Sequence, residues 1–227
     1  MSGAQNCLRC RASEKLTAAR IRWIAGAACL FLTLSPALSQ ELGPATDYEW
    51  ELQTPGRTMF RDRSLIGSVP LAQTRERKSP LTKAKVRTHE ALAVYTDVSF
   101  VPGDTTRYFG ADLVLQGEAE LFASVILDPD ELGPLETALR YILKTAEGIR
   151  TSERSDTQIF FRGKNNWEVL FQQQGTAQRI EIHFAAVSSF AEQRRDLQAA
   201  QVTALADIVA TALSELKRQG ALSPEGP

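Results

Sequence analysis

The segment from residue 127 to residue 148, LDPDELGPLETALRYILKTAEG, decides the fold class because it predicts a capped amphipathic helix. Asp128 is a suitable N-cap, Pro129 suits the first helical position, and Glu131 stands where a capping box needs it. Gly148 is expected to end the helix in the left-handed conformation. The apolar residues lie three or four positions apart, on one helical face; they are Leu132, Leu135, Ala138, Leu139, Ile142 and Leu143.

A second helix is predicted near the C-terminus, from about residue 198 to residue 219. Adding seventy to each apolar position of the first helix gives Val202, Leu205, Ile208, Val209, Ala212 and Leu213, which are again all apolar. This helix also runs into a glycine, Gly220. Two long helices, each with one buried face, are therefore expected.

Alternating apolar and polar residues predict strands before each helix. They cover about 91–101, 111–116 and 119–127, then 158–161, 167–172, 179–184 and 188–193. A short strand is also expected at 48–52, with Tyr48, Trp50 and Leu52 on its buried side. Residues 57–87 contain nine basic and two acidic residues, which favours an exposed connector over an anion- or partner-binding arm.

These elements predict an α+β fold: one antiparallel sheet of about six to eight strands with two long helices on one face. The expected divisions are a leader (1–39), an N-terminal segment (40–90) that is partly flexible, an α+β domain (91–220) and a disordered tail (221–227). Within the domain, 91–148 and 157–220 resemble each other in the spacing of several apolar, glycine and arginine residues. This spacing favours a duplicated meander-plus-helix unit, and separate origins of the two halves stay open.

The first 39 residues match a secretory signal peptide: five basic residues, an apolar run at 24–38, and small residues before a cleavage site after Ser39. We therefore expect a periplasmic or extracellular protein that is not transmembrane after cleavage. The alternative is a leader that is kept as an anchor.

Removal of this leader changes what chemistry is available. Residues 40–227 have 21 basic and 26 acidic residues, a net charge of −5, so a general attraction to nucleic acid or anionic lipid is not expected. All three cysteines, Cys7, Cys10 and Cys29, lie in the leader, so the mature chain has no disulfide, thiolate nucleophile or cysteine-bound metal.

No catalytic or cofactor motif is found in the sequence. Dinucleotide, Walker and Gly-x-Ser-x-Gly patterns are absent. The acidic residues 128–131 fit helix capping better than catalysis or calcium binding. His89 and His183 are far apart in sequence, which makes a metal site unexpected, and no catalytic residue, cofactor or metal is predicted.

Arg107 and Arg179 stand at equivalent places after a turn in the two halves. Exposed strand arginines are the commoner case, but these two are the candidate ligand or anion contacts.

The function favoured by these features is an exported, non-enzymatic binding or assembly protein with an unidentified protein or envelope ligand. The alternative is an envelope enzyme of the hydrolase type whose site cannot be found from one sequence. A nucleic-acid binder is a third hypothesis, and the negative charge argues against it unless residues 57–87 supply the contacts.

Overall fold

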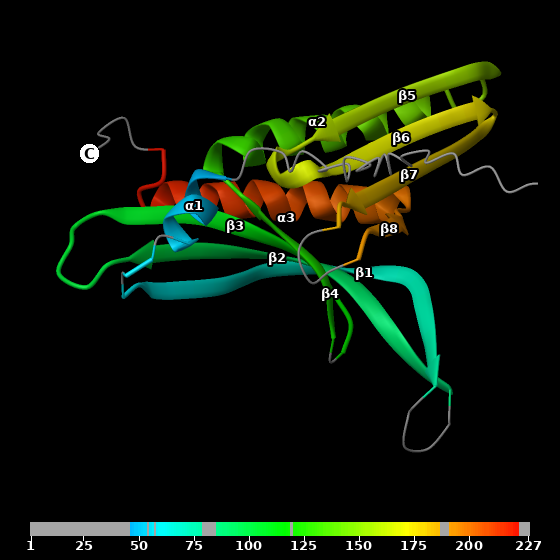
Figure 1. The fold of residues 1–227 in the computed structure, drawn as a ribbon. Helices are drawn as coiled ribbons and strands as arrows, with labels where there is room; N and C mark the ends of the chain where they lie inside the picture. The colour runs from blue at the N-terminus through cyan, green and yellow to red at the C-terminus, as the bar shows by residue number, and fades with distance from the viewer. Residues whose placement is uncertain are drawn as a thin grey trace, which may run out of the picture. The chain divides into compact units, whose positions relative to one another are not determined.

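The computed structural model describes residues 46–53, 55–56, 58–78, 85–118, 120–186 and 191–222 (Figure 1). The predicted leader, its cleavage site and the last five residues lie outside these ranges. The helices are α1 (Asp47–Gln53), α2 (Pro129–Gly148) and α3 (Ala199–Arg218), with a short 3-10 turn η1 (Lys164–Asn166). The strands are β1 (Phe60–Lys78), β2 (Lys85–Phe100), β3 (Arg107–Gln116), β4 (Leu121–Leu127), β5 (Arg154–Arg162), β6 (Trp167–Gly175), β7 (Ala177–Phe184) and β8 (Gln193–Asp196).

The strands form two antiparallel sheets of four strands each, in the orders β1-β2-β3-β4 and β5-β6-β7-β8. We call them sheet A and sheet B. The α+β class is confirmed, but the prediction of a single sheet of about six to eight strands is wrong. Helix α2 separates β4 from β5, and β5 pairs with β6 to begin a new sheet. After α1, the described chain thus has the order four strands, then a 20-residue helix, twice in succession. A duplication as the origin of the two halves stays a prediction.

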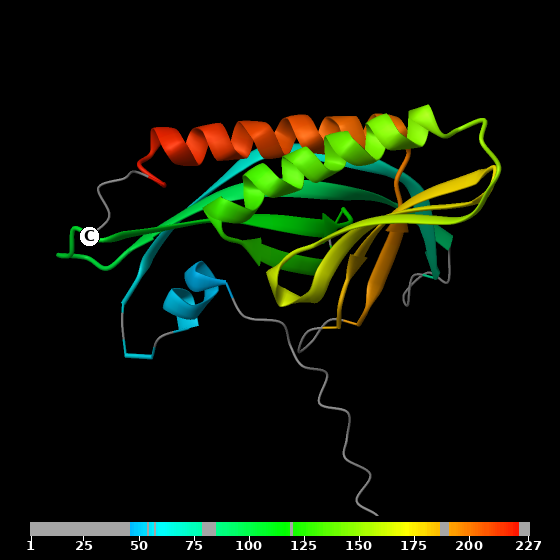
Figure 2. The ribbon, with the colours of Figure 1, turned by 90° about the horizontal axis from the view of Figure 1, so that it is seen from above.

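Each long helix packs chiefly on the sheet formed by the other half of the chain. Helices α2 and α3 lie side by side, and α3 lies against β1 and β2 while α2 lies against β5 and β6 (Figures 1 and 2). Gly67 in β1 marks the close approach of α3, because a Cβ atom there would stand 2.9 Å from Ile208. The two halves are therefore interlocked, and neither sheet is covered by its own helix alone.

Helix α3 is long and apolar enough to cross a membrane by length and composition, the one such helix among the described residues. Its position in the fold accounts for this composition. One face meets α2 and another meets sheet A, so apolar residues are needed around much of its circumference. Its fully buried side chains are Val202, Leu205, Ala206, Val209, Ala212 and Leu216.

The short strand predicted at 48–52 is wrong, because these residues belong to helix α1. The Asp128 carboxylate accepts the backbone N–H groups of Asp47 (3.0 Å) and Tyr48 (3.1 Å) at the start of this helix. The Tyr48 ring covers Gly110 of β3, where a Cβ atom would stand only 2.5 Å away, and its hydroxyl is hydrogen-bonded to Ser99 (2.6 Å). Contacts distant in sequence thus override a local alternation typical of a strand.

Residues 60–78 form strand β1, so the exposed connector predicted over 57–87 is wrong for this part of the segment. Val69 and Leu71 are buried in the core, and β1 pairs with β2 along its length with two register shifts. Two of the basic residues that suggested a connector, Arg61 and Arg63, pair with aspartates of β2 and β3.

The predicted ends of the long helices are partly confirmed. Asp128 is the N-cap of α2, and its backbone N–H donates to the Glu131 carboxylate (3.0 Å). Gly220 has a φ of +105° after α3, and the Ala221 amide donates to the Leu216 carbonyl (2.9 Å), as in a Schellman motif. The left-handed cap expected at Gly148 is wrong, because α2 includes Gly148 and ends at Ile149 with a φ of −109°.

Candidate functional site

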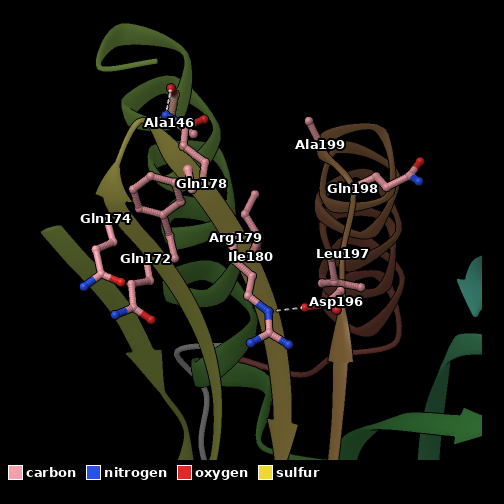
Figure 3. A pocket seen from close by; sticks show the side chains of 12 residues that line it. Ala146, Gln172, Gln174, Gln178, Arg179, Ile180, Asp196, Leu197, Gln198 and Ala199 are labelled. Atoms are coloured by element: carbon pink, nitrogen blue, oxygen red, sulfur yellow. Dashed lines mark hydrogen bonds and ion pairs between the residues drawn. The ribbon is translucent and has the colours of Figure 1, made fainter. Parts of the chain in front are cut away.

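A cavity of about 720 Å³ opens where β8 leaves sheet B (Figure 3). Strand β8 pairs only with residues 181–184 of β7, and the chain then turns into α3 after one more backbone hydrogen bond, from Leu197 to the Ile180 carbonyl (2.8 Å). Among the described residues, the first half of β7 therefore pairs with β6 on one side and has no strand on the other. The lining residues are Ala146, Phe171, Gln172, Gln174, Ala177, Gln178, Arg179, Ile180, Asp196, Leu197, Gln198 and Ala199.

One wall of the cavity is fixed by side-chain amides. The Gln178 amide donates to the Ala146 carbonyl of α2 (2.7 Å) and to the Gln173 side chain (2.9 Å). Gln173 is fully buried and donates to the Ile149 (3.3 Å) and Ser152 (2.6 Å) carbonyls. These bonds satisfy carbonyls at and beyond the C-terminus of α2, which the helix itself leaves unpaired. The wall is therefore held in place before any ligand arrives.

Arg179, a candidate contact from the sequence, lines this cavity but is already paired. Its Nε donates to Asp196 Oδ1 (2.5 Å), and its Nη2 lies 2.9 Å from Glu181 Oε1. The hydrogen bond to Asp196 and the charge of Glu181 raise the pKa of the guanidinium. Two carboxylates thus balance its charge, which makes a simple anion site less favourable than a site for a neutral polar group.

The other candidate contact, Arg107, lies elsewhere in the fold. It begins β3 in sheet A, opposite Phe100, and lines a separate cavity of about 510 Å³ with Asp128, Asp130 and residues of α1. The two cavities share no lining residue. The structure therefore does not bring Arg107 and Arg179 together in one of these sites, and each is to be tested as a ligand contact separately.

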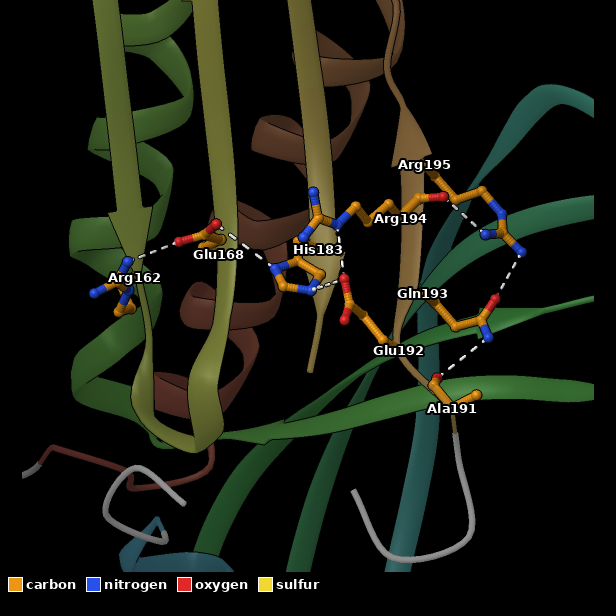
Figure 4. A network of polar contacts seen from close by, with 8 residues as sticks. All are labelled: Arg162, Glu168, His183, Ala191, Glu192, Gln193, Arg194 and Arg195. Carbon is orange, nitrogen blue, oxygen red and sulfur yellow. Dashed lines mark hydrogen bonds and ion pairs between the residues drawn. The ribbon is translucent and has the colours of Figure 1, made fainter. Parts of the chain in front are cut away.

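His183 lies on the outer face of sheet B between two carboxylates (Figure 4). Its Nε2 is 3.1 Å from Glu192 Oε1 and its Nδ1 is 3.6 Å from Glu168 Oε1. Arg162 and Arg194 neutralise these carboxylates, at 3.1 Å from Glu168 and 2.8 Å from Glu192. A histidine beside carboxylates can act as a general base. Here each carboxylate also has an arginine partner, and none of the five side chains in this row carries a hydroxyl or thiol that could act as a nucleophile.

A second charged cluster lies in sheet A, on the face that carries α1; its two aspartates are buried and its two arginines are exposed. Arg61 binds Asp97 through Nε (2.9 Å) and Nη2 (2.7 Å) and reaches Asp112 (2.9 Å), which also pairs with Arg63 (2.8 Å). Burial raises the pKa of Asp112 to about 6; the Asp97 carboxylate adds to the rise, and Arg63 and Arg61 oppose it. Asp97 is fully buried. The cluster joins three strands and pairs both buried carboxylates with arginines, so we interpret it as a structural element with an unusual acid.

Sequence reasoning missed most of these groups for identifiable reasons. Asp97 and Asp112 stand inside apolar strand segments, VYTDVSF and GADLVLQ, and a charged residue in such a segment is a signal of a buried partner. The amide wall has no comparable signal, because Gln173 and Gln178 look like ordinary exposed strand residues.

Comparison of the chain with protein-family models, with curated proteins and with solved structures finds no match. In the part of the chain that the structure describes, no group of three or more His, Cys, Asp or Glu side chains is arranged to hold a metal ion.

Proposed function

We propose that this protein is an exported, non-enzymatic binding protein that holds a neutral, amide- or hydroxyl-bearing ligand in the cavity beside β7. The observation that carries the proposal is the chemistry of the cavity lining: side-chain amides of Gln172, Gln174 and Gln178 around an apolar floor that includes Phe171 and Ile180. Ligand sites are typically concave, about 300–1,000 Å³ in volume, and mostly apolar with a few fixed polar groups.

The charges favour a ligand without net charge. Arg179 and Asp196 form a pair at the rim, so the site offers both donors and acceptors without a surplus of either sign. An exposed glutamine amide such as that of Gln174 can donate and accept at once, which suits peptide groups and the acetamido groups of sugars. The Arg179 guanidinium would then serve as a ligand contact through donors that Asp196 and Glu181 do not use.

The export part of the proposal rests on the leader pattern in residues 1–39. Its test is the N-terminal sequence of the protein recovered from cells, which should begin at Gln40. Recovery of the chain with its leader intact would favour the anchored alternative.

The binding part is tested by NMR titration of the ¹⁵N-labelled protein with two probes, alanine tripeptide and N-acetylglucosamine trimer. We expect amide shifts confined to residues 171–180 and 196–199. Ala177→Trp should abolish them, because Ala177 is exposed at the cavity and the indole would fill it. Ala191→Trp, a substitution at an exposed residue outside the lining, is the matched control.

Failure of both probes to shift these amides, or shifts that survive Ala177→Trp, would overturn the proposed site. The enzyme alternative has its own observation, His183 between Glu168 and Glu192. A hydrolase acting there should lose its activity on ester or glycoside probes in His183→Gln. Under the binding proposal, His183→Gln leaves the titration with both probes unchanged.

A further inference from the structure

Among the residues that the structure describes, strand β5 forms an edge of sheet B. It pairs with β6 on one side only, and its residues Asp156, Gln158, Phe160 and Arg162 are exposed. A register shift between Arg154 and Thr157 interrupts the start of the strand, which leaves a regular run from Thr157 to Arg162. An edge of this kind offers a row of backbone donors and acceptors to another strand.

The backbone groups that face this edge can be identified from the ladder. The Gly163 amide donates to the Trp167 carbonyl (3.1 Å), so the odd-numbered residues of this stretch point their N–H and C=O groups at β6. The even-numbered residues of the regular run, Gln158, Phe160 and Arg162, point theirs at the free edge. An added strand would pair with these groups.

An apolar groove runs beside this edge, between β5 and α2. It has a volume of about 760 Å³ and is lined by Gly133, Pro134, Glu136, Thr137, Ala138, Tyr141, Ile159 and Phe160. Tyr141 and Phe160 are 58% and 59% exposed, which is high for aromatic side chains that flank a groove. A strand added to β5 would place alternate side chains against this groove, as in β-strand addition.

The charges of β5 fit a second copy of the same strand in one register. A two-fold antiparallel pairing centred on Ile159 brings Asp156, just before the regular run, opposite Arg162 of the second copy, and this opposite-charge pair occurs twice. Arg162 is 62% exposed and binds Glu168 of its own sheet through Nη2, so it has further donors for Asp156. A pairing centred on Gln158 would instead oppose Arg154 and Arg162, which repel each other. In the register centred on Ile159, Gln158 of one copy also stands opposite Phe160 of the other. Both residues point their backbone N–H and C=O groups at the free edge, so they can form backbone hydrogen bonds across the two-fold axis.

We propose that two copies of this chain associate through β5, antiparallel and centred on Ile159, to join their B sheets across a two-fold axis. The two Phe160 rings are diagonal neighbours on the outer face, within reach of each other. The two Ile159 side chains face each other beside the grooves. The cavity proposed to bind ligand lies at the β7–β8 side of sheet B and stays open, so self-association is independent of that function.

The test is the oligomeric state of the purified protein by sedimentation velocity. We expect a concentration-dependent dimer. Asp156→Arg should raise the dissociation constant of the dimer roughly tenfold or more, because it places an arginine opposite Arg162 of the other copy at each of two symmetric positions. The double variant Asp156→Arg, Arg162→Asp should restore it. Glu118→Arg makes the same charge change in a turn of sheet A and should leave the dimer unchanged.

A second variant separates loss of the dimer from loss of folding. Phe160→Pro removes an N–H that points at the free edge and makes no bond to β6, so the fold should persist while the dimer is lost. A monomeric wild-type protein at all concentrations would overturn the proposal. So would a dimer that survives both Asp156→Arg and Phe160→Pro, or one that the double variant fails to restore.

Discussion

Arg195 of β8 binds Glu90 of β2 side-on, with Nε 2.5 Å from Oε2 and Nη2 3.2 Å from Oε1. The residues are 105 positions apart, and their side chains are 11% and 2% exposed. This pair therefore connects sheet A to sheet B away from the helices. Gln193 accepts a further bond from Arg195 (3.1 Å), which fixes the guanidinium in place.

Glu90→Gln should lower the free energy of unfolding by about 3–5 kcal/mol, because it leaves a buried guanidinium without its counter-charge. Replacing both residues, as Glu90→Leu with Arg195→Met, should recover most of this loss since no buried charge is left. Urea denaturation of the two variants gives the comparison. A double variant no more stable than the single one would show that the pair itself, and not the orphaned charge, stabilises the contact between the sheets.

The stability of the protein should depend on pH through Asp112. Its folded pKa of about 6 lies above the ordinary value of 3.8, so the folded state holds a proton that the unfolded state releases between these values. The contribution of Asp112 to the free energy of unfolding is greatest at pH values below about 4. It falls as the pH rises to about 6, by at most roughly 1.4 kcal/mol per pH unit.

Asp112→Asn should remove this part of the slope between pH 4 and pH 6, measured by urea denaturation at each pH. Burial also raises the pKa of Glu131, so some slope of the same sign will persist in the variant. Asp62→Asn, at an exposed position of β1, is the control and should leave the slope intact. An identical pH profile for Asp112→Asn and the wild type would contradict the assignment.

Asp128 should contribute more than an ordinary helix cap. Besides starting α2, its carboxylate binds the first two amides of α1 and lies 2.5 Å from Lys164 Nζ. A cap alone contributes about 1 kcal/mol, and each hydrogen bond to a charged group adds roughly 1.5–3 kcal/mol. We expect Asp128→Ala to cost about 4 kcal/mol or more in urea denaturation, against at most about 0.5 kcal/mol for the exposed neighbour in Asp130→Ala. A loss of only about 1 kcal/mol would reduce Asp128 to a simple cap.

The two long helices and most strands could be predicted because their patterns are local. The six apolar positions of each helix determine its buried face, and Asp128 and Glu131 mark the start of α2 within four residues. Each strand predicted between residues 91 and 184 falls on an observed strand. The prediction at 188–193 meets β8 only at Gln193, and residues 187–190 lie outside the described ranges.

The errors concern features that depend on distant residues. Strand β1 looked like a basic connector because Arg61 is neutralised by Asp97 and Asp112, 36 and 51 positions away. Helix α1 depends on a carboxylate 81 positions from its first residue. Periodicity shows that a helix buries one face but does not say which sheet it covers, so the separation into two sheets could not be predicted. The candidate cavity depends on where β8 stops, and a strand of four residues leaves little pattern.

The exchange of helices between the halves predicts that neither half folds alone. Without α3, sheet A exposes the core face that carries Leu92, Val94 and Leu113. Without α3 and sheet B, α2 loses most of the surface that covers its apolar face. Four fully buried residues of α2, Leu132, Leu135, Leu139 and Ile142, contribute roughly 1.5–3 kcal/mol each. Their loss is comparable to the whole stability of a typical domain, about 5–15 kcal/mol.

The test uses fragments 40–150 and 151–227, cut in the exposed turn after α2. Each fragment alone should give the far-ultraviolet circular dichroism and near-ultraviolet signal of an unfolded chain. Mixed together, they should regain the spectrum of the intact chain. A cooperative thermal transition in either fragment by itself would refute the interlocked arrangement.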